Sequence, residues 1–308
     1  MKIVVIGPGA LGCLLASSLA AGTDHAIWLL DHDPKRALLL SRQGIFLERG
    51  GTETKKSIPV THDASTIGIA DFVFLCVKSH HTESALVSMS QLLSRESLLL
   101  AFQNGINHLD ILQQKMSSPW VAGVTSMGAT LVDQGRVRFG GTGITSLGFL
   151  SPANDQEAAK LAHAAELLNS AGFETVITND ILSKIWNKFL INIGINALTA
   201  IHNCPNGRLL ETPSIKNQLR AAVKEALHVA KAKGITISEN PVSLTETVCR
   251  ATSQNISSML QDIRNQRQTE IEAINGALIR EARLLGLETP VNEELADEVR
   301  NLQMKYLN

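Results

Sequence analysis

The first 178 residues alternate short apolar runs with stretches of helical character. Four runs are continuous and rich in leucine and β-branched residues: 3–6, 26–30, 71–77 and 97–102. Continuous apolar strands separated by helices are typical of a parallel sheet that is covered on both faces. The glycine-rich region 123–148, with Val, Thr and Phe between the glycines, predicts further strands and hairpins.

From Asp180 onward the strand pattern disappears. The composition predicts helices over residues 181–201, 214–233, 241–252 and 253–285. Gly234 and Gly286 follow two of these segments, where glycine commonly ends a helix. The chain is therefore predicted to be α/β, with an N-terminal domain over 1–178 built on a parallel sheet and a C-terminal all-helical domain over 179–308.

Composition and charge narrow the class of partner. A length of 308 residues suggests two domains, and 44% hydrophobic residues are enough to build their cores. The 28 Lys and Arg residues nearly balance the 29 Asp and Glu residues, for a net charge of −1. Without a field of one sign, nucleic acid and anionic membranes are unexpected partners. We expect a small molecule or another protein chain.

The cysteines indicate neither a disulfide framework nor a metal site. Cys13, Cys76, Cys204 and Cys249 are scattered, and none belongs to a Cys/His cluster with metal-ligand spacing. Free thiols of this kind fit a reducing compartment. Glycine and proline at positions 7–9 interrupt the apolar N-terminus before a signal-peptide core could form. We expect a cytoplasmic protein without a metal.

A glycine-rich motif directly follows the first predicted strand. Residues 7–12 read GPGALG and match G-x-G-x-x-G between a strand and a helix. In this context the first glycine makes the tight turn, the second admits the pyrophosphate, and the third lets helix and strand pack closely. The predicted cofactor contacts are Gly7, Pro8, Gly9, Ala10, Leu11 and Gly12. The motif predicts that the N-terminal domain over 1–178 is a Rossmann-type dinucleotide-binding domain. The motif alone does not separate NAD(P) from FAD.

The end of the second strand bears on the choice of cofactor. Asp31 lies nineteen residues beyond Gly12, where an acidic residue usually accepts a hydrogen bond from a ribose 2′-hydroxyl and favours NAD. The neighbouring His32, Lys35 and Arg36 could instead hold a 2′-phosphate. Asp31 and His32 are both predicted to contact the cofactor.

A second candidate site lies on the first helix of the helical half. Lys188, Asn192 and Asn196 are spaced by four residues, so they share one face of an otherwise apolar helix. Burying these groups without partners would cost several kcal/mol. They form either a polar seam between helices or a catalytic site, in which Lys188 acts as general acid and the amides position substrate oxygens.

A third group of polar residues spans 255–271 and could be an ordinary solvated helix face. Ser258 and Glu270 are twelve residues apart and would point about 120° apart on a straight helix. If both serve one site, the helix must break between about Asp262 and Gln268.

These motifs together resemble the ketopantoate reductase (2-dehydropantoate 2-reductase) family over essentially the whole chain. The resemblance rests on GPGALG at 7–12, VKS at 77–79, QNG at 103–105, Lys188 with Asn192 and Asn196, LTAIHNCPNG at 198–207, SSMLQD at 257–262, TEI at 269–271 and ING at 274–276. Proteins of this family reduce ketopantoate to pantoate with NADPH on the route to pantothenate and coenzyme A.

The resemblance implies a role for individual residues. It makes Lys188 the general acid of a helical substrate and catalytic domain. The implied substrate contacts are Asn104, Asn192, Asn196, Asn206 and Ser258, with Ser258 at the carboxylate. The implied cofactor contacts are Lys78 and Asn104 near the nicotinamide, Ala129 through its backbone, and Glu270 at the ribose.

One departure from the family leaves the cofactor open. The family commonly has an arginine near the end of strand two to hold the 2′-phosphate, whereas this chain has His32 between Asp31 and Asp33. NADP(H) is the expected cofactor, with NAD(H) as the alternative. Alternatives for function are reduction of another branched 2-keto acid, a β-hydroxyacid dehydrogenase, and a dinucleotide-sensing regulator without turnover. A homodimer through the helical domain is also expected.

Overall fold

The protein consists of two compact units in a computed structural model that describes residues 1–21, 24–237 and 239–307. The first unit comprises Met1–Gln103 and Leu109–Ile181, and the second comprises Asn104–His108 and the described part of Leu182–Asn308. The short segment Asn104–His108 therefore packs with helices that follow it by more than seventy residues in the sequence. The assignment of 1–178 and 179–308 to cofactor and substrate functions stays a prediction.

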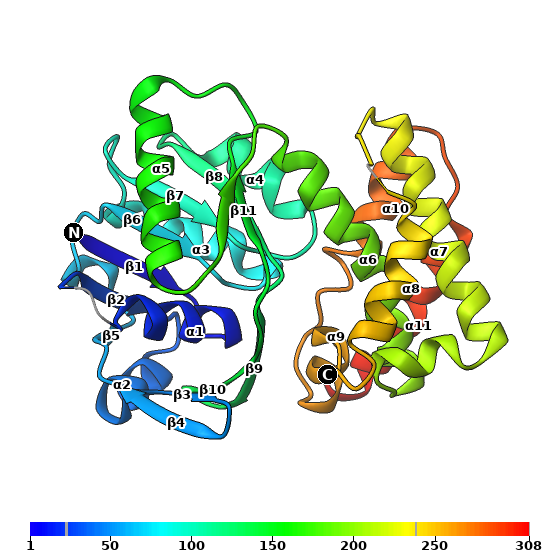
Figure 1. Ribbon diagram of the computed structural model, residues 1–308, viewed down its shortest axis with the longest axis horizontal. Helices are drawn as coiled ribbons and strands as arrows, with labels where there is room; N and C mark the ends of the chain where they lie inside the picture. The colour runs from blue at the N-terminus through cyan, green and yellow to red at the C-terminus, as the bar shows by residue number, and fades with distance from the viewer. Residues whose placement is uncertain (22–23, 238, 308) are drawn as a thin grey trace. The chain divides into compact units, whose positions relative to one another are not determined.

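An eight-stranded sheet forms the centre of the first unit (Figure 1). Its order is β12 (Thr175–Ile177), β11 (Thr145–Gly148), β8 (Trp120–Thr125), β7 (Leu98–Ala101), β6 (Phe72–Leu75), β1 (Lys2–Ile6), β2 (Ala26–Leu30) and β5 (Val60–Thr61). Neighbouring strands are parallel except at the β11–β8 pair. The four apolar runs predicted as strands are the four adjacent strands β7, β6, β1 and β2, so the predicted parallel sheet is confirmed.

Both faces of this sheet are covered, as the continuous apolar runs predict. In β1, Ile3 and Val5 belong to the core on one face, with α1 (Ala10–Leu19) and α5 (Asp155–Ser170), whereas Val4 and Ile6 belong to the core on the other face. That second core includes residues of α3 (Thr82–Met89) and α4 (Asn107–Lys115). Because successive side chains of a strand point to opposite faces, a strand buried on both sides has no polar position.

The glycine-rich region contributes to two sheets rather than one. It supplies β8 and β11 to the large sheet, and β9 (Gly128–Asp133) and β10 (Arg136–Gly141) to a four-stranded sheet of order β4-β3-β10-β9. The other two strands are β3 (Ile45–Arg49) and β4 (Thr52–Lys56), which follow α2 (Pro34–Gln43). β3 pairs in parallel with β10. The sequence predicts the hairpins but not their partition between two sheets.

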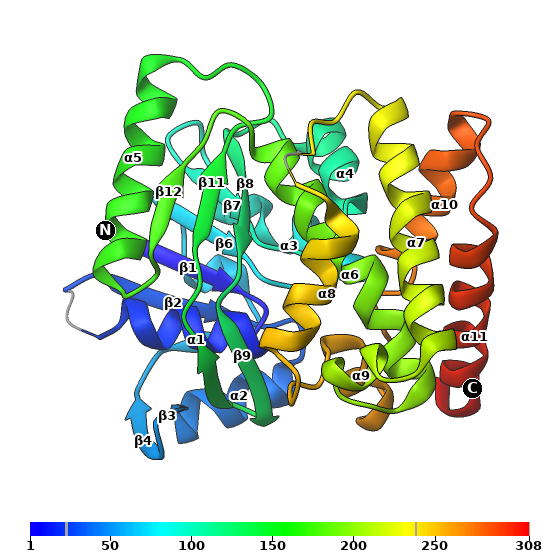
Figure 2. The ribbon, with the colours of Figure 1, turned by 45° about the vertical axis from the view of Figure 1, so that its right-hand side comes forward.

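The second unit is helical, and its described residues contain no strand (Figure 2). Its elements are α6 (Ile181–His202), α7 (Pro213–Ala232), α8 (Pro241–Ala251), α9 (Ser258–Arg264), α10 (Asn275–Leu284), α11 (Pro290–Leu307) and the 3-10 turn η4 (Asn206–Leu210). A Cβ on Gly194 would lie 2.7 Å from Val223 and 2.8 Å from Thr245, so α6 packs closely against α7 and α8. Gly234 and Gly286 end helices with φ of 72° and 67°, as predicted.

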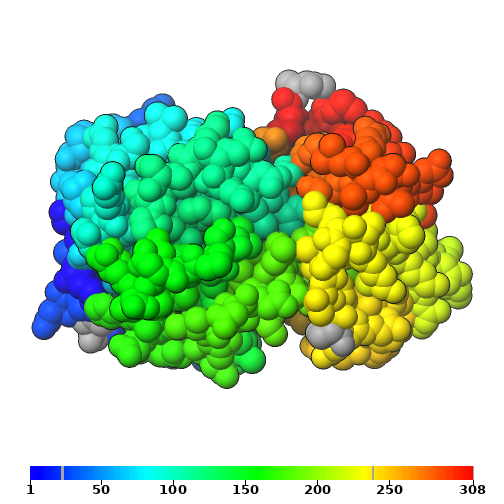
Figure 3. All heavy atoms as spheres, turned by 90° about the horizontal axis from the view of Figure 1, so that it is seen from above, coloured from blue at the N-terminus to red at the C-terminus, as the bar shows by residue number. Residues whose placement is uncertain are grey.

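Two predictions about these helices need correction. The continuous helix expected over 253–285 is wrong, because α9 ends at Arg264 and α10 begins at Asn275. Gln266 between them has a left-handed φ of 51°, which an α-helix does not accommodate. The last helix, α11, was not among those predicted; it packs against α10, and the two helices lie side by side as orange and red atoms in Figure 3.

In the part of the chain that the structure describes, no helix is both long and apolar enough to cross a lipid bilayer.

Candidate active site

The glycine motif of the first unit has the geometry that a bound pyrophosphate requires. Gly7 has a φ of +94°, and a Cβ there would lie 2.8 Å from a methyl group of Val77. A Cβ on Gly12 would lie 2.0 Å from the carbonyl oxygen of Gly7, so only glycine lets α1 start this close to the turn. A Cβ on Gly9 would meet nothing within 4 Å. The open side of the loop is therefore at Gly9, the N-cap of α1, where a phosphate group fits.

Asp31 is placed differently from the expectation for a ribose-binding carboxylate. Its side chain has no exposed surface, and its two oxygens accept hydrogen bonds from Nε and Nη2 of Arg36, both at 2.5 Å. The Arg36 side chain remains 32% exposed, and its pairing with Asp31 raises the pKa of the guanidinium. Of the two paired side chains, only that of Arg36 reaches solvent, and the ribose contact of Asp31 stays a prediction.

Three histidines gather near this arginine. The ring centroids of His32 and His81 are 5.1 Å apart, and those of His80 and His81 are 4.3 Å apart. His80 and His81 belong to the 3-10 turn η2 (Ser79–His81), which Lys78 precedes at the carboxyl end of β6. The structure therefore brings the predicted residues His32 and Lys78 to one edge of the sheet. Ala129, in β9 opposite Phe139, is half-buried.

In the second unit, the predicted polar face of α6 is present. Lys188, Asn192 and Asn196 occupy successive turns of one uninterrupted helix, and Asn196 is buried. Burial of Lys188 lowers the pKa of its ammonium group, and the opposing charge of Glu270 raises it by less. A lysine with a lowered pKa gives up its proton more readily than an exposed one, as a general acid must.

Asn104 joins this group because its segment belongs to the helical unit. Its Nδ2 donates a hydrogen bond to Oε2 of Glu270 at 3.2 Å. The next residue, Gly105, has a φ of +78°, and a Cβ there would lie 2.2 Å from the carbonyl oxygen of Ala273. Close packing between these two backbone segments holds Asn104 against the turn that carries Glu270. The negative charge of Glu270 in turn acts on the ammonium of Lys188 and raises its pKa.

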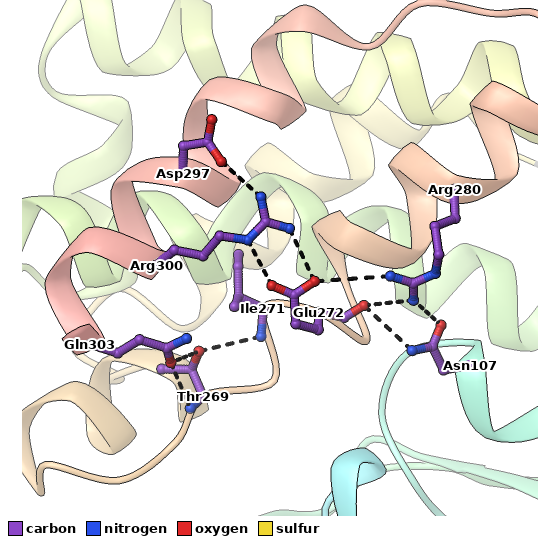
Figure 4. Close-up of polar contacts among 8 residues, drawn as sticks. All are labelled: Asn107, Thr269, Ile271, Glu272, Arg280, Asp297, Arg300 and Gln303. Atoms are coloured by element: carbon purple, nitrogen blue, oxygen red, sulfur yellow. Dashed lines mark hydrogen bonds and ion pairs between the residues drawn. The ribbon is translucent and has the colours of Figure 1, made fainter. Parts of the chain in front are cut away.

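A network of charged side chains fixes the C-terminal side of this turn (Figure 4). Arg300 of α11 donates to both carboxylate oxygens of Glu272, at 2.7 and 3.0 Å, which lowers the pKa of that carboxyl group. Arg280 of α10 donates to the carbonyl oxygen of Glu272 at 3.0 Å and to Oδ1 of Asn107. Arg280 therefore links the segment that carries Asn104 to the turn that carries Glu270.

The N-terminal side of the turn is fixed by α11 as well (Figure 4). Oε1 of Gln303 accepts from the backbone nitrogen of Thr269 at 3.2 Å and from its hydroxyl at 2.9 Å. The same hydroxyl accepts from the backbone nitrogen of Ile271 at 3.3 Å. Glu270 is thus held from both sides. Sequence patterns did not identify Arg280, Arg300 and Gln303, because nothing in their spacing relates them to a turn one or two helices earlier.

The remaining substrate candidates have distinct surroundings. Asn206 is buried, and its Nδ2 donates to Thr252 Oγ1 at 2.9 Å, whereas its Oδ1 is buried with no hydrogen-bond partner among the described residues. Ser258 is exposed and is the first residue of α9. The preceding Ser257 is buried, caps this helix and shares a 2.6 Å hydrogen bond with Thr199 of α6.

Among the described residues, no group of three or more His, Cys, Asp or Glu side chains could hold a metal ion. Cys13 and Cys76 have pKa values raised by burial, that of Cys13 to about 12. Both thiols are therefore protonated at neutral pH and act as packing groups.

The glycine loop at the start of a parallel sheet and the polar face around Lys188 define a dinucleotide-binding oxidoreductase. Two family models cover most of the chain: "Ketopantoate reductase PanE/ApbA" matches residues 3–152, and "Ketopantoate reductase PanE/ApbA C terminal" matches residues 180–303. The chain belongs to this ketopantoate reductase family.

Similar proteins span the full length of the chain. A 2-dehydropantoate 2-reductase of Halobacterium salinarum is 36% identical over 98% of this chain and 99% of its own. The crystal structure of a PanE/ApbA family ketopantoate reductase from Ralstonia eutropha has a TM-score of 0.90 and 27% identity, and it covers both chains completely. D-mandelate dehydrogenase, in a ternary structure with NADH and anilino(oxo)acetate, has a TM-score of 0.91 and 25% identity over 99% of both chains.

Proposed function

We propose that this protein reduces the ketone of 2-dehydropantoate to the alcohol of pantoate, with a nicotinamide dinucleotide as hydride donor. The observation that carries the proposal is the environment of Lys188, a half-buried lysine whose ammonium has a lowered pKa. The charge of Glu270 acts on this ammonium, and Asn192 and Asn196 share its helix face. The 2-dehydropantoate 2-reductases among the relatives support the choice of substrate. The proposal assigns 1–178 to the cofactor and 179–308 to the substrate and catalysis.

Lys188 is the proposed general acid. The nicotinamide ring, when bound, supplies the hydride that reduces the ketone carbon. Negative charge then grows on the ketone oxygen, where the ammonium of Lys188 stabilises it and supplies the proton. Burial strengthens this interaction because little water competes for the charge. Glu270 keeps Lys188 protonated before the reaction, since its negative charge favours the ammonium form.

The amides and one hydroxyl are the proposed substrate contacts. Asn192 and Asn196 follow Lys188 on the same face and would hold the substrate's oxygens beside the proton donor. The buried Oδ1 of Asn206 supports a role as hydrogen-bond acceptor for a substrate hydroxyl, because it has no partner among the described residues. Asn104 would contact both substrate and cofactor, and the exposed hydroxyl of Ser258 would bind the carboxylate.

The proposed cofactor is NADP(H). The loop of residues 7–12 would hold the pyrophosphate through the amide groups at the start of α1, with Gly9 on its open side. Lys78 would contact the cofactor near the nicotinamide, Ala129 would contact it through its backbone, and Glu270 would hold its ribose. The partly exposed side chain of Arg36 supports NADP(H), whereas the NADH in the similar D-mandelate dehydrogenase structure keeps NAD(H) as the alternative.

A second candidate function is the reduction of a different 2-keto acid. It is favoured by the similarity to D-mandelate dehydrogenase in complex with anilino(oxo)acetate, since the same proton donor suits any ketone beside a carboxylate. Initial rates with 2-dehydropantoate, 2-oxoisovalerate and phenylglyoxylate decide between the two. The proposal requires kcat/KM to be highest with 2-dehydropantoate, and a higher value with either of the other two keto acids would favour the second candidate function.

The predicted homodimer is tested by sedimentation equilibrium.

A further inference from the structure

The sheet order places two loops beside the glycine motif. β1 lies between β6 and β2, and all three strands are parallel, so their carboxyl ends meet at one edge of the sheet. The glycine loop follows β1, His32 follows β2, and His81 lies in the turn after β6. The 5.1 Å separation of the two imidazole rings shows that the outer loops approach each other at this edge. In a dinucleotide-binding fold, the loop after the second strand reads the adenosine ribose.

The charges around His81 are mostly positive. The groups that act on it are His32, Lys78 and Arg36, together with the adjacent ring of His80. Two carboxylates lie in these loops. Both oxygens of Asp31 bind Arg36, and its Oδ1 also lies 3.5 Å from Nδ1 of His32. Asp33 caps α2 by accepting from the backbone nitrogens of Lys35 and Arg36. The pKa of His81 is lowered, first by burial and then by these cations.

We propose that Arg36 and His81, with His32 beside them, form a proton-linked site for the 2′-phosphate of NADP(H), so that the preference for NADPH over NADH rises as the pH falls. The inference rests on the proposed function only in requiring that a dinucleotide binds at the glycine loop. Arg36 supplies a permanent charge whose orientation Asp31 fixes. His81 supplies a charge that depends on pH. Asp31, from this view, holds the arginine and does not bind the ribose.

The direction of the pH effect follows from the charges. A phosphate monoester carries close to two negative charges above its second pKa of about 6. Such a group beside His81 favours the imidazolium, so NADPH binding takes up a proton between the pKa of free His81 and its higher value in the complex. Affinity for NADPH therefore falls as the pH rises through that interval. One proton taken up corresponds to about tenfold in affinity per pH unit at most. NADH has no 2′-phosphate, so its affinity does not depend on the protonation of His81 in this way.

His80 does not share this role. Burial and the neighbouring charges of His81 and Lys78 lower its pKa to about 4, so it is neutral at about pH 6 and above. Its ring packs against His81 and limits the space on that side of the imidazole.

The experiment measures dissociation constants for NADPH and NADH by nucleotide fluorescence, without substrate, from about pH 6 to about pH 8.5. We expect the dissociation constant for NADH divided by that for NADPH to fall by about three- to tenfold from the lowest to the highest pH. This is the size of effect that uptake of less than one proton produces. His81→Gln should flatten this ratio and weaken NADPH binding while leaving NADH binding within about twofold. His228→Gln, on the exposed side of α7, is the matched control and should behave as the wild type.

The outcomes separate the two proposals. A pH-independent ratio in the wild type overturns the proton-linked site, even if the protein reduces 2-dehydropantoate rapidly. Equal weakening of NADPH and NADH by His81→Gln also overturns it, because the ring would then pack against the adenosine common to both. A pH-dependent ratio without turnover of any keto acid would support the site and contradict the proposed function. Failure to bind either dinucleotide would contradict both.

Discussion

Asn104 and Glu270, 166 positions apart in the sequence, are joined by a 3.2 Å hydrogen bond within one compact unit. The negative charge of Glu270 in turn favours the protonated form of Lys188 by raising its pKa. The amide therefore orients the carboxylate on which the protonation of the proposed general acid depends. The short segment that carries Asn104 packs with the helical unit, so the geometry of these three side chains is set within that unit alone.

Removal of the Lys188 ammonium tests the proton donor. Lys188→Ala should lower kcat by about 10²–10⁴, because the ketone oxygen loses the acid that neutralises its growing charge. Lys184→Ala, one turn earlier on the same helix and exposed, is the matched control and should retain normal kcat. Steady-state kinetics of both variants provide the measurement. Near-normal turnover of the Lys188 variant would exclude the role.

The negative charge of Glu270 should affect the dependence of kcat on pH. A general acid is lost as the pH rises through its pKa, so kcat falls on the alkaline side of the profile. Burial already lowers the pKa of Lys188, and Glu270 opposes that effect. Glu270→Gln should therefore lower this pKa further and move the alkaline limb of kcat to lower pH. Glu293→Gln, an exposed partner of Arg283, should leave the limb in place. An unmoved limb in the Glu270 variant would show that its charge does not act on the acid.

Gly105 should tolerate no side chain. Its φ of +78° disfavours other residues by about 1–2 kcal/mol, and a Cβ would collide with the carbonyl oxygen of Ala273 at 2.2 Å. Gly105→Ala should lower the free energy of unfolding by about 2–5 kcal/mol, or displace Asn104 with loss of activity. Gly172→Ala is the control, because Gly172 has a φ of +83° and nothing within 4 Å of a Cβ. Urea denaturation should show a loss of only about 1–2 kcal/mol for that variant. Equal losses would contradict the close approach at Gly105.

The contact between Arg280 and Asn107 should matter for catalysis at a distance. Asn107→Leu removes the oxygen that accepts from Arg280 and loosens the segment that carries Asn104. We expect kcat/KM to fall by about 3- to 30-fold, on the scale of one lost charge-assisted hydrogen bond. Asn107→Asp retains an acceptor for Arg280 and should restore most of that loss. If both variants are equally impaired, or neither is, the contact does not position Asn104.

The sequence predicted the parts of the molecule that local patterns encode. Continuous apolar runs identified β1, β2, β6 and β7, because a strand buried on both faces leaves no polar position. The glycine spacing identified the turn before α1, since Gly12 faces the carbonyl of Gly7 at a distance that no side chain permits. The four-residue spacing of Lys188, Asn192 and Asn196 predicted a shared helix face for the same geometric reason.

Contacts that depend on the three-dimensional fold could not be predicted from such patterns. Nothing in the sequence around Asp31 shows that Arg36 covers both carboxylate oxygens, since that depends on the direction of the first turn of α2. The hydrogen bond from Arg300 to Glu272 forms only because α11 packs against α10. The break between α9 and α10 was foreseen only as a condition for Ser258 and Glu270 to share a site.

The central claim is tested most directly by nicotinamide absorbance with 2-dehydropantoate, with NADPH and NADH in parallel reactions of the full chain. The proposal predicts rapid oxidation that depends on the keto acid, a higher kcat/KM with NADPH, and formation of pantoate in equal amount. Tight binding of both dinucleotides without oxidation of either would contradict it, and would identify a protein that binds the dinucleotide without turnover.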